Sequence, residues 1–364
     1  MEKVNVLIIG AGVIGLAVGK ALSEEFEDVV IVEQEKSFGR HTSSRNSEVI
    51  HSGIYYPQNS LKAKLCLEGN EMLYDFAKTH NITYKKTGKI VVATSEEELP
   101  SLIDLKENGG KNNVSGLRII DESECNKLEP QILAVKGLLV PSSGIIDTHK
   151  LMQKLESESE KNDAFVVYDM KVISIQKNEK TYIVEFSNEE IFEANILINC
   201  AGLFCEDIAK MVGIETIENN LKIYWCKGEY YKTTKIKNIE HLIYPIPSSI
   251  SCGIHLSLNL ADECRFGPNA NYVDKLNYAI TDKYKKKFFV SVKKYIEIDE
   301  ENLNMDDCGI RAKLQGPNDN FRDFYIKEET EKGYSNFINL MGIDSPGLTA
   351  CLSIAEEVKR ILST

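Results

Sequence analysis

Three glycines and one acidic residue near the start of the chain have the spacing of a dinucleotide-binding turn. The sequence GAGVIG places Gly10, Gly12 and Gly15 between the apolar run VNVLII and an apolar-periodic stretch, and Glu33 ends the next apolar run. An acidic residue about 20 positions after such glycines binds a ribose hydroxyl. Glycines let the backbone approach a pyrophosphate, and the following helix offers its positive end. The pattern predicts a dinucleotide site.

A polar segment, GRHTSSRNS at 39–47, follows this unit. Its hydroxyl and amide groups suit a polyol chain, and its arginines suit a pyrophosphate. This composition favours FAD over NAD. We expect cofactor contacts from Gly10, Gly12, Val13, Ile14, Gly15, Glu33, Gln34, Arg40, Thr42, Ser43, Ser44, Asn46 and Ser47.

The segment HSGIYYP, residues 51–57, places a histidine close to two tyrosines, and its glycine and proline interrupt any regular pattern. It is either a loop held for packing or a segment that faces a reaction. Its position directly after the polar segment favours the second interpretation. If the segment is extended, His51, Gly53 and Tyr55 share one side, and Tyr56 points to the other and packs.

Apolar periodicity predicts the elements that position these residues. We expect strands at 4–9, 29–33, 89–94, 117–121, within 166–202, within 223–273 and at 336–343, and helices at 13–26, 72–80, 148–162, 274–295 and 348–363. Segments 306–317 and 339–350 are expected to be glycine turns. The second would place a helix amino terminus, around Gly347 to Thr349, where it stabilises negative charge on a reduced flavin.

The pieces of the dinucleotide domain occur at the start, middle and end of the chain, with strand-rich segments between them. We therefore expect a mixed α/β (α+β) fold, in which a Rossmann-like FAD-binding domain is interleaved with an antiparallel-sheet substrate domain. The expected boundaries are 1–83, 144–218 and 306–364 for the first domain, and 84–143 and 219–305 for the second.

Composition excludes several classes of function. The formal net charge of −12 over 364 residues argues against a nucleic-acid partner. Nine cysteines without C-x-x-C spacing predict reduced thiols and no metal site. A first strand that begins almost at Met1, and the lack of a run of roughly 18 apolar residues, predict a cytoplasmic protein. The lysine-rich stretch 282–295 is interpreted as a solvated helix face; the alternative is peripheral contact with the inner face of an anionic membrane.

Several long segments resemble the L-2-hydroxyglutarate dehydrogenase/oxidase family, within the D-amino-acid-oxidase/glycerol-3-phosphate-dehydrogenase (DAO) superfamily of FAD enzymes. They are NSEVIHSGIYYPQNSLKAKLC (46–66), KGEYY (227–231), GIHLSLNLADECRFGPNA (253–270), GIRAKLQGPNDNFRDFYI (309–326) and GIDSPGLTA (342–350). The resemblance implies a DAO/glutathione-reductase-like fold. It also implies oxidation of L-2-hydroxyglutarate, a small 2-hydroxy dicarboxylate, to 2-oxoglutarate with reduction of FAD.

This reaction needs a base for the 2-hydroxyl proton while a hydride moves from C2 to flavin N5. His51 suits that task near neutral pH. The resemblance implies that Arg311, His255 and Tyr55 act with His51 in catalysis. It also implies that the substrate is bound by Lys313, Arg265, Tyr244 and Ser345. A guanidinium suits this substrate because it binds a carboxylate through two hydrogen bonds. Further cofactor contacts are expected from Val172, Ala201, Gly202, Gly309, Arg311, Gly342, Asp344, Gly347, Leu348 and Thr349.

Other interpretations stay open at this point. One alternative is a flavin enzyme that oxidises an amino acid, an amine or glycerol 3-phosphate. The other is a flavin-binding assembly protein without turnover. The electron acceptor, oxygen or a quinone, is not fixed by the residues.

Overall fold

The computed structural model describes residues 1–247 and 253–363, which form two compact units. The first unit contains Met1–Ser44, Thr148–Trp225 and Arg311–Thr364, and the second contains Arg45–Asp147 and Cys226–Ile310. Residues 45–83, expected in the FAD-binding domain, lie in the second unit. These residues form hydrogen bonds with other parts of the second unit. Asn70, for example, donates to the carbonyl of Ser142 at 3.0 Å.

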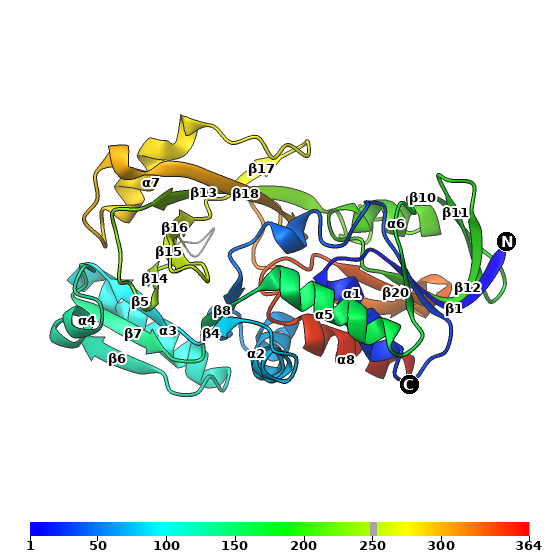
Figure 1. The fold of residues 1–364 in the computed structure, drawn as a ribbon, viewed down its shortest axis with the longest axis horizontal. Coiled ribbons are helices and arrows are strands. Elements are labelled where there is room, and N and C mark those ends of the chain that lie inside the picture. The colour runs from blue at the N-terminus through cyan, green and yellow to red at the C-terminus, as the bar shows by residue number, and fades with distance from the viewer. Residues whose placement is uncertain (248–252, 364) are drawn as a thin grey trace. The chain divides into compact units, whose positions relative to one another are not determined.

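The first unit is built on an eight-stranded sheet (Figure 1). Its centre is parallel: β1 (Glu2–Ile9) pairs with β2 (Val29–Val32) and with β12 (Ile191–Asn199), and β12 pairs with β20 (Tyr334–Met341). The remaining strands are β9 (Phe165–Val167), β10 (Val172–Lys177), β11 (Tyr182–Phe186) and β19 (Tyr325–Glu329). The apolar runs predicted these central strands because a parallel strand is buried on both faces.

Four helices belong to the first unit. They are α1 (Val13–Leu22), α5 (Thr148–Glu160), α6 (Cys205–Val212) and α8 (Cys351–Leu362), and α1 packs against both α5 and α8. Gly19 makes the packing of α1 on the sheet close, since a Cβ there would lie 2.3 Å from the side chain of Ile31. Helix α1 therefore starts directly after the glycine turn and is held tightly on β1 and β2.

The second unit is built on a nine-stranded sheet that is mostly antiparallel. Its strands are β5 (Lys89–Ala93), β6 (Arg118–Asp121), β7 (Lys136–Val140), β13 (Tyr224–Thr233), β14 (Leu242–Pro245), β15 (His255–Leu258), β16 (Cys264–Gly267), β17 (Asn271–Val273) and β18 (Asn304–Lys313). One neighbouring pair, β14 and β5, is parallel. A three-stranded sheet of β3 (Val49–Ile50), β8 (Gly144–Ile146) and β4 (Tyr84–Lys85) completes the strands of this unit.

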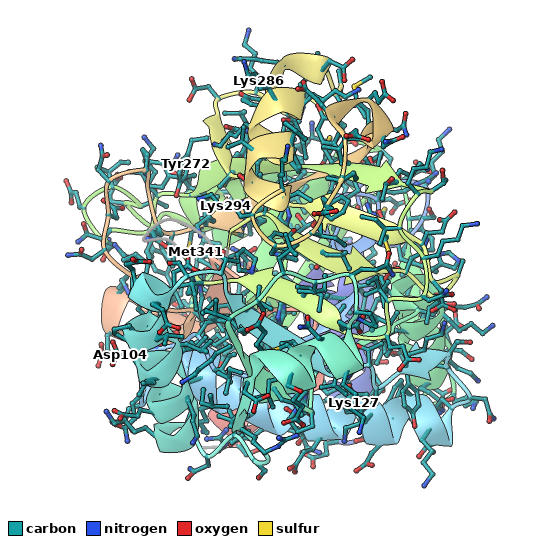
Figure 2. The ribbon with its side chains drawn as sticks, turned by 90° about the vertical axis from the view of Figure 1, so that its left-hand side faces the viewer. Asp104, Lys127, Tyr272, Lys286, Lys294 and Met341 are labelled. Carbon is teal, nitrogen blue, oxygen red and sulfur yellow. The ribbon has the colours of Figure 1, made fainter. Side chains whose placement is uncertain are left out.

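The helices of the second unit are α2 (Leu61–Thr79), α3 (Leu99–Lys111), α4 (Glu122–Leu128) and α7 (Lys285–Val292). Helix α2 begins well before the expected residue 72, because Ser60 caps it by accepting a hydrogen bond from the amide of Ala63 at 3.1 Å. Helix α7 is shorter than the expected 274–295; Phe288 and Val292 are buried, whereas Lys286, Lys287 and Lys294, two of them labelled in Figure 2, are exposed.

The segment 306–317, expected to be a glycine turn, instead contributes residues 306–313 to strand β18. Gly309 is a glycine because a Cβ there would lie 2.0 Å from the carbonyl oxygen of Arg45. A close approach between distant segments therefore explains it, and a turn does not.

Across residues 1–247 and 253–363, no helix is long and apolar enough to cross a membrane. The same part of the chain holds no cluster of His, Cys, Asp and Glu suited to a metal ion. Eight cysteines within it are buried free thiols.

Candidate active site

The glycine turn of the first unit is closely packed, and side chains larger than hydrogen would not fit at two of its positions. A Cβ on Gly15 would lie 1.8 Å from the carbonyl oxygen of Gly10, and one on Gly10 would lie 2.6 Å from the carbonyl oxygen of Cys200. Gly10 also has a φ of 107°, which favours glycine. The turn thus brings bare backbone to the amino terminus of α1, as binding of a pyrophosphate requires.

Glu33 lies beside this turn at the end of β2. Its carboxylate accepts hydrogen bonds from the amides of Ala11 at 2.8 Å and Glu35 at 3.0 Å. Burial raises the pKa of Glu33, and these two bonds oppose that change. The carboxylate is therefore held in one position by these two bonds. The sequence predicts that it binds a ribose hydroxyl there.

The polar segment closes over the same turn. Ser43 accepts a hydrogen bond from the amide of Val13 at 3.0 Å, so its hydroxyl occupies the amino terminus of α1. His41 lies 3.3 Å from the carboxylate of Glu35. Ser44 is exposed, and Asn46 belongs to the second unit, where its side chain accepts from the amide of Glu48 at 2.7 Å.

The end of β12 supplies the other wall of the turn. The amide of Cys200 donates to the carbonyl of Ile9 at 2.9 Å, and Ala201 and Gly202 follow directly. Beneath them, the buried amide of Asn199 donates to the carbonyl of Cys205 at 2.8 Å and to the side chain of Asn339 at 2.9 Å. Sequence reasoning missed this asparagine pair, which fixes the carboxyl ends of β12 and β20 to each other.

The turn that precedes α8 holds the last group of expected residues. Lys313 pairs with Asp344 at 3.3 Å, and both side chains are mostly buried. Gly342 has a φ of 67°, and the amide of Gly347 donates to the carbonyl of Asp344 at 2.6 Å. The sequence predicted a helix amino terminus around Gly347 to Thr349. Helix α8 instead begins at Cys351, and Gly347 to Thr349 form a turn before it.

Other expected residues of the first unit are placed as follows: Ile14 in α1, Gln34 after β2, Arg40 and Thr42 in the polar segment, Val172 at the start of β10, Arg311 near the end of β18, and Ser345 and Leu348 in the turn before α8. Ser47 and Gly309 belong to the second unit.

In the second unit, residues 51–57 form a turn, so the extended conformation on which the predicted alternation depended is not formed. Gly53 has a φ of 92°, a conformation that favours glycine. Three asparagine side chains hold the backbone of the turn. Asn70 of α2 donates to the carbonyl of His51 at 2.8 Å, Asn108 of α3 donates to those of Ile54 and Tyr56, and Asn112 donates to those of Gly53 and Tyr56.

The side chains beside this turn form a cluster of rings around one lysine. The ring of Tyr244 stacks on the imidazole of His255, with centroids 3.7 Å apart, and faces Tyr55 at 6.3 Å. Lys89, which is 0% exposed, places its ammonium 4.0 Å from the centroid of Tyr244 and 5.2 Å from that of Tyr55. We call Tyr55, Lys89, Tyr244 and His255 the ring cluster.

The ring cluster acts on His51. Burial, the charge of Lys89 and the charge of His255 together lower the pKa of His51 well below its usual value. The imidazole is therefore neutral at physiological pH and has a nitrogen that accepts a proton. This is the protonation state that a general base requires.

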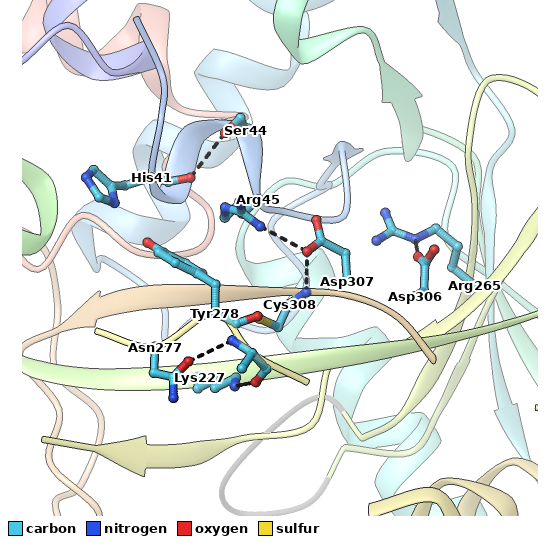
Figure 3. Close-up of polar contacts among 11 residues, drawn as sticks. His41, Ser44, Arg45, Lys227, Arg265, Asn277, Tyr278, Asp306, Asp307 and Cys308 are labelled. Atoms are coloured by element: carbon cyan, nitrogen blue, oxygen red, sulfur yellow. Dashed lines mark hydrogen bonds and ion pairs between the residues drawn. The ribbon is translucent and has the colours of Figure 1, made fainter. Parts of the chain in front are cut away.

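Arg265 lies on β16, the strand that pairs with β15, which carries His255. Its Nε donates to the carboxylate of Asp306 at 2.5 Å (Figure 3). Its guanidinium lies 4.6 Å from the ring centroid of Tyr230. Arg45 likewise bonds to Asp307 at 3.0 Å. These ion pairs connect β18 to its neighbours, which favours a structural role for Arg265 over the expected contact with substrate.

Lys89 and the three asparagines are functional candidates that sequence reasoning missed. Asn108 lies in α3 and Asn112 caps its carboxyl end, so their i, i+4 spacing places both on the same side. The sequence contains this signal. Lys89 gives no such signal, since a lysine at the start of an apolar strand is normally exposed.

Comparisons with known proteins agree with this geometry. A family model described as FAD dependent oxidoreductase matches residues 5–361. The chain is 35% identical to L-2-hydroxyglutarate dehydrogenase, mitochondrial, of Arabidopsis thaliana, over 98% of this chain and 83% of that one. It is 32% identical to L-2-hydroxyglutarate dehydrogenase of Indibacter alkaliphilus, over 97% of each chain.

Solved structures show the same fold. L-alpha-glycerophosphate oxidase from Mycoplasma pneumoniae, with FAD bound, superposes with a TM-score of 0.89, 26% identity, and coverage of 100% of this chain and 96% of that one. Glycine oxidase from Geobacillus kaustophilus superposes with a TM-score of 0.84 at 17% identity, over 100% and 95% of the two chains.

The mixed α/β fold and the FAD cofactor expected from the sequence are thereby confirmed. With its glycine turn, its fixed Glu33 and its match to relatives along nearly its whole length, the chain belongs to the DAO family of FAD-dependent oxidoreductases and, within it, to the L-2-hydroxyglutarate dehydrogenases.

Proposed function

We propose that the protein oxidises the 2-hydroxyl group of L-2-hydroxyglutarate to the ketone of 2-oxoglutarate, with His51 as the general base. The names of the relatives supply the substrate. The observation that carries the role of His51 is its place in the turn 51–57, where Asn70 holds its carbonyl at 2.8 Å. Burial beside Lys89 and His255 keeps the imidazole neutral when the substrate arrives, as a base requires.

Bound FAD supplies the acceptor, at flavin N5, for the hydride that leaves C2. The residues that would hold FAD are the glycine turn, Glu33 for the ribose, and the polar segment with Ser43 for the phosphates and polyol. Gly342, Asp344 and Gly347, with Lys313 through its pair with Asp344, would contribute further contacts to FAD.

The chain's own residues handle the proton and the carboxylates. His51 accepts the hydroxyl proton as the C2–H bond breaks, so the oxygen keeps the electron pair that forms the ketone. Arg311 binds a substrate carboxylate through its two-pronged guanidinium. Tyr55 and His255 orient the substrate, and the asparagines that hold residues 51–57 keep His51 in place.

Reoxidation of the flavin needs a second acceptor, which we propose is oxygen or a quinone. The exposed lysines of α7 would bring the protein to an anionic membrane surface if the acceptor is a membrane quinone. Sedimentation with anionic vesicles, compared with neutral ones, distinguishes this contact from a solvated helix face.

The decisive experiment is anaerobic titration of the purified holoprotein with L-2-hydroxyglutarate, D-2-hydroxyglutarate, L-lactate, glycerol 3-phosphate and sarcosine. We expect the visible flavin band to bleach with the L-dicarboxylate and not with its D isomer. Bleaching by glycerol 3-phosphate alone would favour the activity named for the Mycoplasma relative. Bleaching by sarcosine alone would favour an amine, and no bleaching by any compound would favour a protein without turnover.

A further inference from the structure

A chain of buried hydrogen bonds runs through the first unit and ends beside the glycine turn. It starts at Glu329, the last residue of β19, which is 1% exposed. The carboxylate accepts from Tyr325 at 2.9 Å and from Asn339 at 3.0 Å, and it pairs with Lys332 at 2.6 Å. Asn339 in turn accepts from Asn199 at 2.9 Å. We call Glu329, Asn339 and Asn199 the hydrogen-bond chain.

The two asparagines meet because they lie opposite each other in neighbouring parallel strands. The register pairs Asn199 of β12 with Asn339 of β20, and both side chains are fully buried. A buried amide costs free energy unless its NH2 group and its oxygen both find partners. Both groups of both asparagines have such partners, so the chain is satisfied along its whole length.

The direction of these bonds is imposed from both ends. A carboxylate that pairs with an ammonium group only accepts hydrogen bonds, so Asn339 turns its NH2 group toward Glu329 and its oxygen toward Asn199. At the other end, the NH2 group of Asn199 donates to the carbonyl of Cys205 at 2.8 Å. The oxygen of Asn199 accepts from the amide of Ala201 at 3.2 Å. One orientation of the two amides therefore serves all these partners.

The charge of Glu329 explains why a single orientation is kept. Taking a charge out of water costs free energy, and an ion pair in the interior does not always repay it. A glutamine of the same shape avoids that cost, but its amide presents either an oxygen or an NH2 group to Asn339. In the second case Asn339 would turn over, and its NH2 group would face that of Asn199. An acceptor without donors removes this alternative.

The hydrogen-bond chain ends on the segment 200–205, which is packed against both parts of the expected cofactor site in the first unit. The carbonyl oxygen of Cys200 lies so close to Gly10 that an added Cβ there would be 2.6 Å away. The ring of Phe204 meets the imidazole of His41 edge-on, with centroids 5.4 Å apart. A shift of this segment would therefore displace the backbone of the glycine turn and the polar segment together.

We propose that Glu329 is a positioning residue for FAD. Through Asn339 and Asn199 it holds the segment 200–205 against the glycine turn, and the protein thereby retains its cofactor. The assignment rests on the proposed function in one respect, that the glycine turn holds FAD. Glu329 acts only through the two asparagines.

The test measures the release of FAD when purified holoprotein is diluted, followed by the rise in flavin fluorescence. Glu329→Gln keeps the shape of the side chain and removes its charge. We expect the dissociation constant for FAD to rise about 10- to 100-fold, which corresponds to one lost hydrogen bond to a charged group. Glu331→Gln makes the same change at an exposed position two residues later, and it should bind FAD as the wild type does. An unchanged dissociation constant in folded Glu329→Gln protein would overturn the proposal.

A double variant separates this positioning role from a purely structural ion pair with Lys332. Asn339→Asp alone places a second carboxylate against Glu329, and the repulsion of like charges should weaken FAD binding. Glu329→Gln combined with Asn339→Asp instead moves the carboxylate one place along the hydrogen-bond chain. The NH2 group of Asn199 again faces a group that only accepts, so we expect FAD binding within about threefold of the wild type.

If Glu329 served only as the partner of Lys332, the double variant would bind FAD no better than Glu329→Gln. That result, or a double variant that does not fold, would overturn the proposal, and the same comparison decides the matter if Glu329→Gln alone does not fold. FAD release needs no substrate. Failure of L-2-hydroxyglutarate to reduce the wild type would therefore refute the proposed oxidation and leave the test of Glu329 in place.

Discussion

The imidazole of His255 lies flat against the ring of Tyr244, with 14° between their planes and 3.7 Å between their centroids. The contact combines a packing role with an electrostatic one, because the same imidazole lowers the pKa of His51. The two roles are separable, since another aromatic ring retains the stacking and removes the charge.

His255→Phe makes that separation. Stacking on Tyr244 is kept, so we expect a melting temperature within a few degrees of the wild type and normal FAD content. The pKa of His51 should rise. At any pH below the pKa of the wild-type His51, each unit of that rise should lower kcat/KM about tenfold. A pH profile identical to that of the wild type would mean that His255 serves packing alone.

His51→Ala should retain FAD and lose the base. We expect the rate of flavin reduction in a stopped-flow experiment to fall by about 100- to 10,000-fold, the usual contribution of a positioned base. Reduction at the wild-type rate in a variant with full FAD content would remove His51 from the mechanism.

The pH dependence of the wild type follows from the lowered pKa of His51. A base works only when it is unprotonated, so kcat/KM should fall as pH falls through that pKa, and the acid limb should lie below about 6.5. The folded protein should also lose stability below that pH, because the unfolded histidine takes up a proton more readily. An acid limb above 7 would contradict this interpretation.

Asn112→Ala removes the side chain that holds the carbonyls of Gly53 and Tyr56. Leaving buried carbonyls without this donor should lower the free energy of unfolding by about 1–3 kcal/mol. The substitution should also lower kcat, because His51 belongs to the same turn, while the FAD content of the protein stays close to that of the wild type. Lys111→Ala, exposed one residue earlier, is the matched control; denaturant unfolding that fails to distinguish the two would refute the role.

Gly15→Ala should abolish FAD binding, because the added Cβ would lie 1.8 Å from the carbonyl oxygen of Gly10. Gly110→Ala is a control in helix α3, where an added Cβ meets nothing within 4 Å, and it should be neutral or stabilising. The ratio of flavin to protein absorbance measures the outcome. Full flavin content in Gly15→Ala would show that the turn can relax.

The glycine turn and its flanking elements were predictable from the sequence because each depends on residues close along the chain. VNVLII, GAGVIG and VVIVE specify β1, the turn and β2 by local apolar pattern alone. The amino-terminal half of α2, which follows its cap Ser60, was not predicted. A lysine, a glycine and an asparagine at buried positions of this helix break the apolar periodicity.

The ring cluster could not be predicted, because distant segments form it. Lys89 is buried only because β5 pairs in parallel with β14, more than a hundred positions later in the chain. Gly309 has a similar origin, since the carbonyl of Arg45 that it meets belongs to a segment far away in the sequence. Neither contact can be predicted from the pattern of neighbouring residues in the sequence.

The three asparagines that hold residues 51–57 bind carbonyl groups, which every amino acid carries. The identity of the side chains at Ile54, Tyr55 and Tyr56 therefore does not enter those bonds. Ile54 is fully buried in the core, whereas Tyr55 and Tyr56, which are half-buried, can be substituted while the histidine keeps its place. A library at these positions would vary which hydroxy acid is accepted without redesign of the base, which makes the turn a point of entry for engineering new specificity.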